Sequence, residues 1–183
     1  MDIPVFKKTT IDSTNEFAKR VLKQNSQLLA TGFVVVAEYQ THGKGTKGRV
    51  WYSQSSGGLY YTLAIKPAQF DFSAIDYYHQ AIAKAIQQVV YTLAHVTLTI
   101  RFPNDLFLAK KKVGGVLMES AMKTTSKATL DYLVIGIGLN INQSTFPPQL
   151  TDIATSLYLE TNQTLDKERL IDPLTLALKT IFL

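Results

Sequence analysis

Residues 38–51 combine glycines with cations in an arrangement that suits the binding of an anion. The segment reads Glu-Tyr-Gln-Thr-His-Gly-Lys-Gly-Thr-Lys-Gly-Arg-Val-Trp and follows an apolar run at residues 33–37. Glycines let a loop bring its backbone N–H groups close to a ligand, and the interleaved cations attract phosphate. A Walker P-loop does not fit, because that motif requires Ser or Thr directly after Gly-Lys. By itself, the segment is equally compatible with a mobile, solvated turn.

A second glycine pattern lies in residues 130–142, where two kinds of residue alternate. One face is apolar and carries Leu133, Ile135, Ile137, Leu139 and Ile141. The opposite face carries Gly136, Gly138, Asn140 and Asn142. Because glycine weakens a strand, two glycines on one face indicate the close approach of a ligand or of another backbone. A bulge or close helix packing explains the glycines equally well.

Two further segments place polar groups beside turns. Residues 101–105 read Arg-Phe-Pro-Asn-Asp, in which Asn104-Asp105 is a good turn pair. Residues 110–112 are three lysines followed closely by Gly114-Gly115, so Lys112 lies beside another site of close backbone approach. Taken alone, the first segment is typical of a plain turn and the second of a solvated hairpin tip.

The elements that must position these residues form a mixed pattern. Ser13 and Glu16 have the spacing of a capping box, which predicts a helix from there to about residue 25. Helical spacing predicts a second helix at residues 72–94. A third helix is expected from about residue 166, with Pro173 either kinking it or opening another. We expect strands at residues 3–8, 33–39, 59–65, 96–102, 106–109, 113–121 and 130–142. Consecutive strands without regular βα alternation favour an α+β fold with a mixed, largely antiparallel sheet.

The composition is that of an ordinary globular protein, and it does not indicate a function. The 183 residues are expected to form one domain, 1–183, and the absence of cysteine excludes disulfides and thiolate chemistry. The N-terminus lacks the pattern of a signal peptide, and no apolar run approaches the ~18–20 residues that cross a bilayer. We therefore expect a cytoplasmic protein without membrane association. The net charge of +5 suits an acidic protein, a nucleotide or nucleic acid alike.

Five short motifs occur in order along nearly the whole chain. They are Ser13-Thr14-Asn15, the loop Gly43-Lys44-Gly45-Thr46-Lys47-Gly48-Arg49 with Trp51, Phe102-Pro103-Asn104-Asp105, Lys112-Val113-Gly114-Gly115 and Gly136-Ile137-Gly138-Leu139-Asn140. Together they resemble the catalytic domain of a biotin protein ligase. The resemblance implies a sheet with helices packed on it, related to class II aminoacyl-tRNA synthetase catalytic domains. It also implies two steps: biotin and ATP give biotinyl-5′-AMP and pyrophosphate, and a lysine of a biotin carrier protein then takes the biotin.

The resemblance implies a role for each matching residue. The implied biotin-binding residues are Ser13, Thr14, Asn15, Gln40, Gly43, Lys44 and Gly115. The implied ATP- or adenylate-binding residues are Thr46, Lys47, Arg49, Trp51, Asn104, Lys112 and Asn140. The implied catalytic residues are Lys112, Lys44, Asp105 and Arg101. ATP and biotin are the implied substrates, with Mg²⁺ on the leaving phosphates. Asp105 is a candidate for metal positioning or for accepting a proton from the target lysine.

The chain also departs from the pattern of many members of that family. Lys44 and Lys47 replace arginines of the glycine loop, and uncharged Thr46 replaces a third, which predicts looser retention of the acyl-adenylate. We expect neither the N-terminal DNA-binding domain of repressor-type relatives nor the C-terminal β-barrel of larger ones, and a homodimer is left open. Two alternatives also stay open. They are a non-catalytic biotin or biotinyl-AMP binder, and the related lipoate ligase, whose usual Arg-Arg-x-Ser-Gly-Gly-Gly segment is absent.

Overall fold

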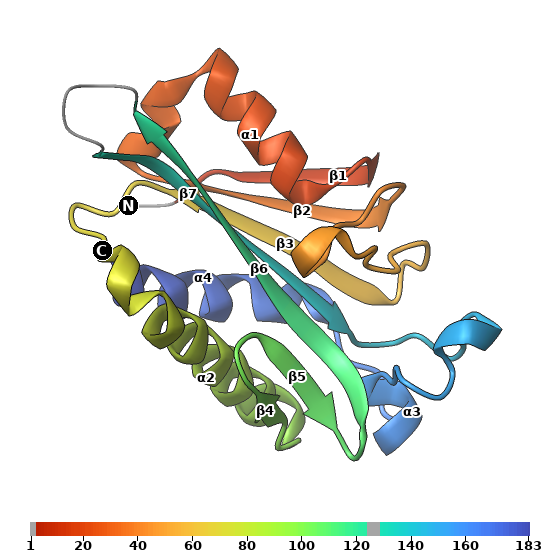
Figure 1. Ribbon diagram of the computed structural model, residues 1–183. Helices are drawn as coiled ribbons and strands as arrows, with labels where there is room; N and C mark the ends of the chain where they lie inside the picture. Colours follow the sequence, from red (N-terminus) through yellow and green to blue (C-terminus); the bar gives the residue numbers. More distant parts are fainter. Residues whose placement is uncertain (1–2, 124–128) are drawn as a thin grey trace.

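A computed structural model describes residues 3–123 and 129–183 (Figure 1). Its strands form one seven-stranded sheet in the order β1-β2-β3-β7-β6-β5-β4. The strands are β1 (Val5–Ile11), β2 (Phe33–Gln40), β3 (Gly58–Ile65), β4 (Thr99–Arg101), β5 (Asp105–Leu108), β6 (Lys111–Lys123) and β7 (Thr129–Asn140). The first two strands pair in parallel, and the remaining neighbours pair antiparallel. The expected mixed, largely antiparallel sheet is confirmed.

Helices cover both faces of this sheet. The α-helices are α1 (Thr14–Gln24), α2 (Ile75–Ala94), α3 (Leu157–Thr161) and α4 (Ile171–Phe182). The larger core lies between the sheet and the helices α2 and α4, whereas α1 packs on the opposite face over a smaller core (Figure 1). Within the described residues, no helix combines the length and the hydropathy that crossing a bilayer requires.

The central strand β3 contributes side chains to both cores, one on each face of the sheet. All eight of its residues are buried, because α1 covers one side of the sheet here and the larger core covers the other. Leu63 belongs to the larger core and Ala64 to the smaller one. Full burial of a side chain such as that of Leu63 contributes roughly 1.5–3 kcal/mol. The buried Thr62 hydroxyl is satisfied because it donates to Asn15 Oδ1 at 2.6 Å, and this bond ties the strand to α1.

Several expected elements differ in their details. The helix expected after Ser13 is present, but Ser13 makes no side-chain capping bond, so the capping box is wrong and Glu16 is used elsewhere. The strand expected at residues 96–102 is reduced to Thr99–Arg101. The first strand begins at Val5 and runs on to Ile11. Pro173 lies in the first turn of α4, where a missing N–H breaks no helical hydrogen bond.

The two faces of β7 are divided as their pattern predicts. Leu133, Ile135 and Ile137 pack into the larger core beneath α2 and α4. Val134 belongs to the α1 side, so Gly136, Gly138 and Asn140 face that side as well. This glycine-bearing face continues beyond the N-terminal end of α1, and it forms the floor of the site.

Candidate active site

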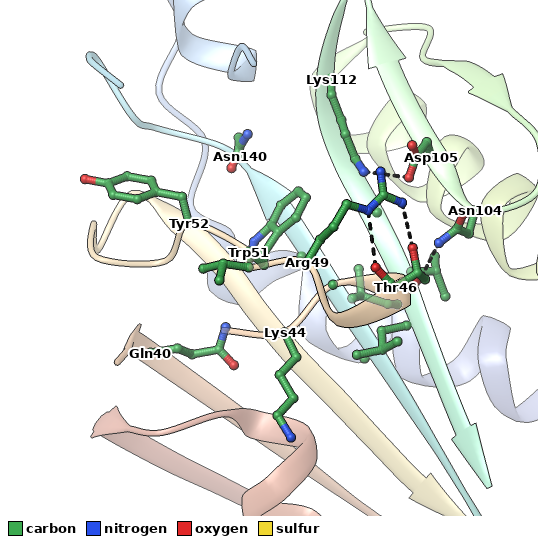
Figure 2. Close-up of a pocket in the computed structure, with 18 of the residues that line it drawn as sticks. Gln40, Lys44, Thr46, Arg49, Trp51, Tyr52, Asn104, Asp105, Lys112 and Asn140 are labelled. Carbon is green, nitrogen blue, oxygen red and sulfur yellow. Dashed lines mark hydrogen bonds and ion pairs between the residues drawn. The ribbon is translucent and has the colours of Figure 1, made fainter. Parts of the chain in front are cut away.

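A cavity of about 240 Å³ opens on the α1 side of the sheet (Figure 2). The N-terminal end of α1, the loop between β2 and β3, the strands β6 and β7, and the segment after β7 form its walls. Most residues expected at a site from the sequence line it: Ser13, Thr14, Asn15, Gln40, Lys44, Thr46, Arg49, Trp51, Asn104, Asp105, Lys112, Gly115 and Asn140. Three expected site residues are not among its lining residues: Gly43, Lys47 and Arg101.

One end of the cavity is held together by buried hydrogen bonds between α1 and β2. Gln40 Oε1 accepts from the backbone N–H of Thr14 at 2.8 Å and from its hydroxyl at 3.2 Å. The Gln40 side chain also donates to the Ser53 hydroxyl at 3.2 Å. Ser13, Thr14, Gln40 and Ser53 are all at most 6% exposed. Because buried polar networks that are well satisfied hold their members rigidly, this end is ordered before any ligand arrives.

Asn15 has a structural role that the sequence did not predict. Its amide nitrogen donates to the Leu117 carbonyl at 3.3 Å and to Glu119 Oε2 at 2.8 Å, while its oxygen accepts from Thr62. Both amide donors are therefore engaged within the chain, although Asn15 lines the cavity. A Cβ at Gly136 would collide with this amide, so the close approach expected at that glycine is to Asn15. This geometry does not support the expected contact between Asn15 and biotin.

The glycine-rich segment folds into a tight hairpin at the cavity mouth. Lys44 and Val50 form a β-bridge, and the Gly45 N–H donates to the Arg49 carbonyl at 2.7 Å. At the tip, Lys47 has a positive φ of 57° and its side chain lies outside the cavity lining. The Arg49 guanidinium donates to the Thr46 carbonyl at 3.2 Å and to the Thr46 hydroxyl at 2.8 Å (Figure 2). The loop is thus preformed, and its Arg49 guanidinium is held by exposed contacts that a ligand can displace.

Gly43 has a packing role, and its expected contact with biotin stays a prediction. A Cβ at this position would collide with the Ser53 hydroxyl and the Trp51 carbonyl. Its own carbonyl accepts from the Trp51 N–H at 2.9 Å. Gly43 therefore lets the loop lie against the neighbouring segment, and its carbonyl helps to hold Trp51 in position.

Lys112 and Asp105 form an ion pair on the opposite wall. Lys112 Nζ lies 2.6 Å from Asp105 Oδ1, although that oxygen is buried and makes no hydrogen bond of acceptable geometry. The Lys112 stem runs past Gly115, where a Cβ would lie 3.4 Å from Lys112 Cε. Lys112 Nζ also lies 5.5 Å from the centre of the Trp51 ring. The ammonium is therefore fixed between a carboxylate and an indole and points into the cavity region (Figure 2).

The Trp51 indole packs closely against the glycine face of β7. A Cβ at Gly138 would be 2.6 Å from the indole, so only glycine permits this contact. The indole Nε1 is buried without a hydrogen-bond partner in the described part of the chain. A buried, unpaired donor costs about 1–3 kcal/mol, so this N–H gains most from a polar ligand atom in the cavity.

Two asparagines hold the cavity walls in place. The Asn104 side chain donates to the Val116 carbonyl at 2.8 Å and so pins the turn before β5 onto β6. The Asn140 amide donates to the Thr155 carbonyl at 2.9 Å and accepts from Gln143 at 3.1 Å. Both residues line the cavity, and in both the amide nitrogen is already used by the backbone of a neighbouring segment.

Arg101 does not take part in this arrangement. Its guanidinium lies 3.7 Å above the Phe107 ring on the neighbouring strand β5, a cation–π contact. The side chain is exposed on the short edge strand β4, outside the residues that line the cavity. The geometry gives no support to the catalytic role expected for it.

Some residues of the cavity wall were not predicted from the sequence. The segment after β7 contributes Phe146, Leu150, Ile153 and Ala154, and the loop before β3 adds Tyr52. This segment joins the site because the Lys112 N–H donates to the Ile153 carbonyl at 2.8 Å, and the Thr155 N–H donates to the Lys112 carbonyl at 2.9 Å. These bonds link residues about forty positions apart in sequence, and no local periodicity reveals such a pairing.

The donor set does not form a resident magnesium site. Among the described residues, no group of three carboxylate or imidazole side chains is placed to hold a metal ion. Asp105 is the one acidic residue in the described cavity lining, and Lys112 is paired with it. Mg²⁺ is held in nucleotide sites mainly through substrate phosphates and one or two carboxylates. The Mg²⁺ expected from the sequence thus has no preformed cage, and no step is assigned to it.

With the fold and the geometry of the cavity described, comparisons with known proteins identify the family of this chain. The model of the biotin/lipoate A/B protein ligase family matches residues 7–140. The chain therefore belongs to this family. It is 31% identical over 169 residues to the bifunctional ligase/repressor BirA of Bacillus spizizenii, which covers 91% of this chain and 50% of that protein. It is 33% identical over 131 residues to BirA of Escherichia coli, which covers 72% of this chain and 38% of that protein.

Solved structures agree with this assignment. The biotin protein ligase of Aquifex aeolicus in complex with biotin and ATP superposes with a TM-score of 0.77 at 28% identity, covering 98% of this chain and 72% of that one. A point mutant of the same enzyme in complex with biotin gives a TM-score of 0.78 at 29% identity, covering 98% and 70%. The expected class of fold is confirmed. The chain spans half or less of the length of the two curated BirA relatives.

Proposed function

We propose that this protein activates biotin with ATP to biotinyl-5′-AMP and transfers the biotin to a lysine of a biotin carrier protein. One observation carries the proposal. A single cavity joins a buried, neutral hydrogen-bonding end around Thr14 and Gln40 to a cationic end with Lys112 and Arg49. A ligand with an uncharged polar ring at one end and a carboxylate at the other matches this polarity. The similar structures that are named as biotin protein ligases support the same reading.

The first step requires stabilisation of negative charge. A carboxylate oxygen of biotin attacks the α-phosphorus of ATP, the new O–P bond forms, and the bond to the pyrophosphate oxygen breaks. Lys112 is the residue we assign to the reacting oxygens, because its ammonium is already fixed by Asp105 and needs little reorganisation. Arg49, at the loop, is placed to exchange its contacts with Thr46 for phosphate oxygens.

The second step transfers the acyl group. The neutral amine of the acceptor lysine attacks the biotinyl carbonyl, AMP leaves with the bonding electron pair, and the amine loses a proton. A free lysine with a pKa of ~10.4 is almost wholly protonated at neutral pH, so a proton acceptor near the carbonyl is useful. Asp105 is our candidate, because it is the acidic residue of the described cavity lining. During both steps, Trp51 and the loop hold water away from the reactive mixed anhydride.

The setting of the reaction is part of the same proposal. The acceptor is a carrier domain, and the net charge of +5 favours an acidic one. We place the reaction in the cytoplasm and assign it no DNA partner, since nothing but net charge in the sequence suits nucleic acid. A homodimer is compatible with this reading but is not needed for the chemistry in the cavity.

Mass spectrometry of an acidic biotin-carrier domain tests this proposal. After incubation with the protein, biotin and MgATP, we expect the carrier to gain one biotinyl group on its acceptor lysine. Omission of ATP is the control and should leave the carrier unmodified. Modification with lipoate in place of biotin would identify a lipoate ligase. Binding of biotin without pyrophosphate release would identify a non-catalytic binder, and either outcome would overturn the proposal.

A further inference from the structure

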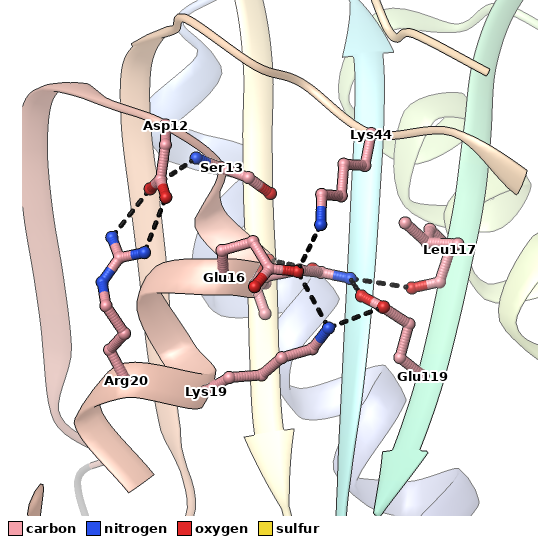
Figure 3. Close-up of polar contacts among 10 residues, drawn as sticks. Asp12, Ser13, Glu16, Lys19, Arg20, Lys44, Leu117 and Glu119 are labelled. Carbon is pink, nitrogen blue, oxygen red and sulfur yellow. Dashed lines mark hydrogen bonds and ion pairs between the residues drawn. The ribbon is translucent and has the colours of Figure 1, made fainter. Parts of the chain in front are cut away.

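A cluster of four charged side chains connects the glycine loop to the body of the protein (Figure 3). The cluster consists of Glu16 and Lys19 on α1, Lys44 in the loop, and Glu119 on β6. Glu16 Oε1 lies 2.7 Å from Lys44 Nζ and 3.0 Å from Lys19 Nζ. Lys19 Nζ lies 2.6 Å from Glu119 Oε1. The charges alternate, so each cation meets a carboxylate and Glu16 meets two cations.

The cluster is built into the fold and is not a chance contact of mobile side chains. Asn15, which is 2% exposed, donates to Glu119 Oε2 at 2.8 Å and thereby anchors the far end of the cluster. The side chains of Glu16, Lys19 and Glu119 are 22–28% exposed, whereas Lys44 is 49% exposed. The ammonium of Lys44, followed by that of Lys19, holds the pKa of the Glu16 carboxyl below its ordinary value, so this carboxylate is charged at neutral pH.

The position of Lys44 gives this cluster a consequence for the cavity. The backbone of Lys44 forms the base of the loop hairpin through its bridge to Val50. Its side chain runs away from Lys112 and Asp105 and toward α1 (Figure 2). The helix that receives it begins with Thr14, whose N–H is bound to Gln40 at the buried end of the cavity. The Glu16–Lys44 pair thus connects the exposed loop of the site to its buried end.

We propose that Glu16 is a positioning residue, which tethers the glycine loop to α1 through Lys44 before any ligand binds. A loop that is already held over the cavity loses less conformational freedom when the ligand arrives, and this favours retention of the bound ligand. Lys44 then acts mainly as the anchor of the loop, while Arg49 and Lys112 provide the cations for the ligand. The part of this inference that concerns ligand retention rests on the proposed function. The tether itself does not.

The structure limits the size of the effect. Ion pairs at a protein surface are weak, so loss of the tether should change loop opening or ligand release by about twofold to fivefold. Partial burial and the second cation on Glu16 favour the upper part of this range. Salt should weaken the effect, because the Debye length falls to about 3 Å at 1 M ionic strength.

Hydrogen–deuterium exchange on the ligand-free protein tests the tether directly. Glu16→Gln should speed amide exchange in residues 41–57 by about twofold to fivefold at low ionic strength, and the difference should disappear near 1 M salt. Glu168→Gln is the matched control, because it removes another lysine–glutamate pair, that with Lys7, away from the loop. The control should leave exchange in the loop unchanged. Equal loop exchange in Glu16→Gln and wild type would overturn the proposal.

A double-mutant cycle adds a second test on the same observable. Lys44→Met should speed loop exchange about as much as Glu16→Gln does, and the double variant should add little to either, because both changes remove the same contact between Glu16 and Lys44. Additive effects would mean that the two residues act separately, and would contradict the tether.

Release of preformed biotinyl-AMP provides the test of the functional part. Glu16→Gln should release it about twofold to fivefold faster than wild type and Glu168→Gln. Slower release from Glu16→Gln would show that Glu16 competes with the ligand for Lys44, which would overturn the proposed role in retention. If wild type forms no adenylate, the proposed function fails, but the exchange measurements still decide whether the tether exists.

Discussion

The two ends of the cavity are built in different ways. At the α1 end, Thr14 and Gln40 are at most 6% exposed and are joined by neutral hydrogen bonds inside the fold. At the loop end, Arg49 and Lys44 make exposed contacts with Thr46 and Glu16. Buried hydrogen bonds are costly to break, whereas exposed ion pairs exchange easily. The first end is therefore suited to recognition of a fixed shape, and the second to charges that appear and leave during a reaction.

The largest effect is expected from Lys112, because its ammonium is fixed beside Asp105 at the cationic end of the cavity. Lys112→Ala should lower the rate of adenylation on the order of 10²–10³-fold, the usual cost of losing one preorganised donor. Biotin-dependent pyrophosphate release measures this rate. Lys111→Ala is the matched control, since the neighbouring Lys111 binds the Thr151 carbonyl at 2.6 Å and does not line the cavity. Loss of less than about tenfold in Lys112→Ala would remove Lys112 from the reaction.

A prediction at Thr46 sharpens the comparison at the loop, because the family resemblance implies an arginine at this position. A charge-assisted hydrogen bond is worth roughly 1.5–3 kcal/mol, so Thr46→Arg should slow release of preformed biotinyl-AMP by about 10–100-fold if the new cation reaches the phosphate. The present Thr46 hydroxyl instead accepts from Arg49 at 2.8 Å. A chase experiment with labelled adenylate gives the release rate. Identical chase rates in wild type and the variant would show that this position does not control retention.

At the rigid end, Asn15→Ala should act on stability. The change removes the bonds that Asn15 makes to the Thr62 hydroxyl, the Leu117 carbonyl and Oε2 of Glu119. We expect the free energy of unfolding to fall by roughly 1–3 kcal/mol, as for a lost buried hydrogen-bonding group. Denaturant unfolding measures this loss. An unchanged unfolding midpoint together with lost biotin binding would instead restore the direct role in binding that the sequence predicted for Asn15.

The packing of Trp51 on β7, the floor of the cavity, is tested by Gly138→Ala. This change adds a Cβ 2.6 Å from the Trp51 indole. Overpacking of this kind costs typically 1–3 kcal/mol, and the indole must move away from β7. Trp51 is the single tryptophan of the chain, so its fluorescence reports this movement alone. We expect a red-shifted emission as the half-buried ring becomes more exposed. An unaltered spectrum would mean that the ring does not rest on Gly138.

The smallest effect is expected from the exposed pair of Asp12 and Arg20, beside the rigid end. The Arg20 guanidinium lowers the pKa of Asp12 to about 2. Because the pKa in the folded state lies below that of an unfolded chain, about 3.9, the stabilisation is present above about pH 4 and is lost as the pH falls toward about 2. The pair is solvent-screened, so Asp12→Asn should cost less than about 1 kcal/mol at neutral pH. Unfolding curves of the two proteins should converge near the lower end of this pH range, and a difference that persists there would contradict this account.

Most of the framework was predictable from sequence because it depends on local patterns. The alternation in β7 predicted both its buried face and its glycine face, and helical spacing predicted α2. The roles of single residues were less predictable. Glu16 was interpreted as part of a capping box, whereas it binds Lys44 and Lys19, because the fold brings the loop within its reach.

Residues of the motifs also proved to differ in what they contact. Asn15 and Gly43 belong to motifs that predict ligand contact, and in the fold Asn15 also bonds to Glu119 while Gly43 packs against Ser53 and Trp51. Arg101 lies one residue before a motif and faces Phe107 outside the cavity. Motif spacing indicates which segments meet, while only packing across the sheet decides which side chains are left to face a ligand.

Formation of the acyl-adenylate without a carrier protein tests the central claim most directly. The protein is incubated with MgATP with and without biotin, and bound biotinyl-AMP is then detected by mass spectrometry. We expect one biotinyl-AMP per chain, formed with release of one pyrophosphate and only when biotin is present. Cleavage of ATP at the same rate without biotin, or no adenylate despite biotin binding, would contradict the claim that this cavity activates biotin.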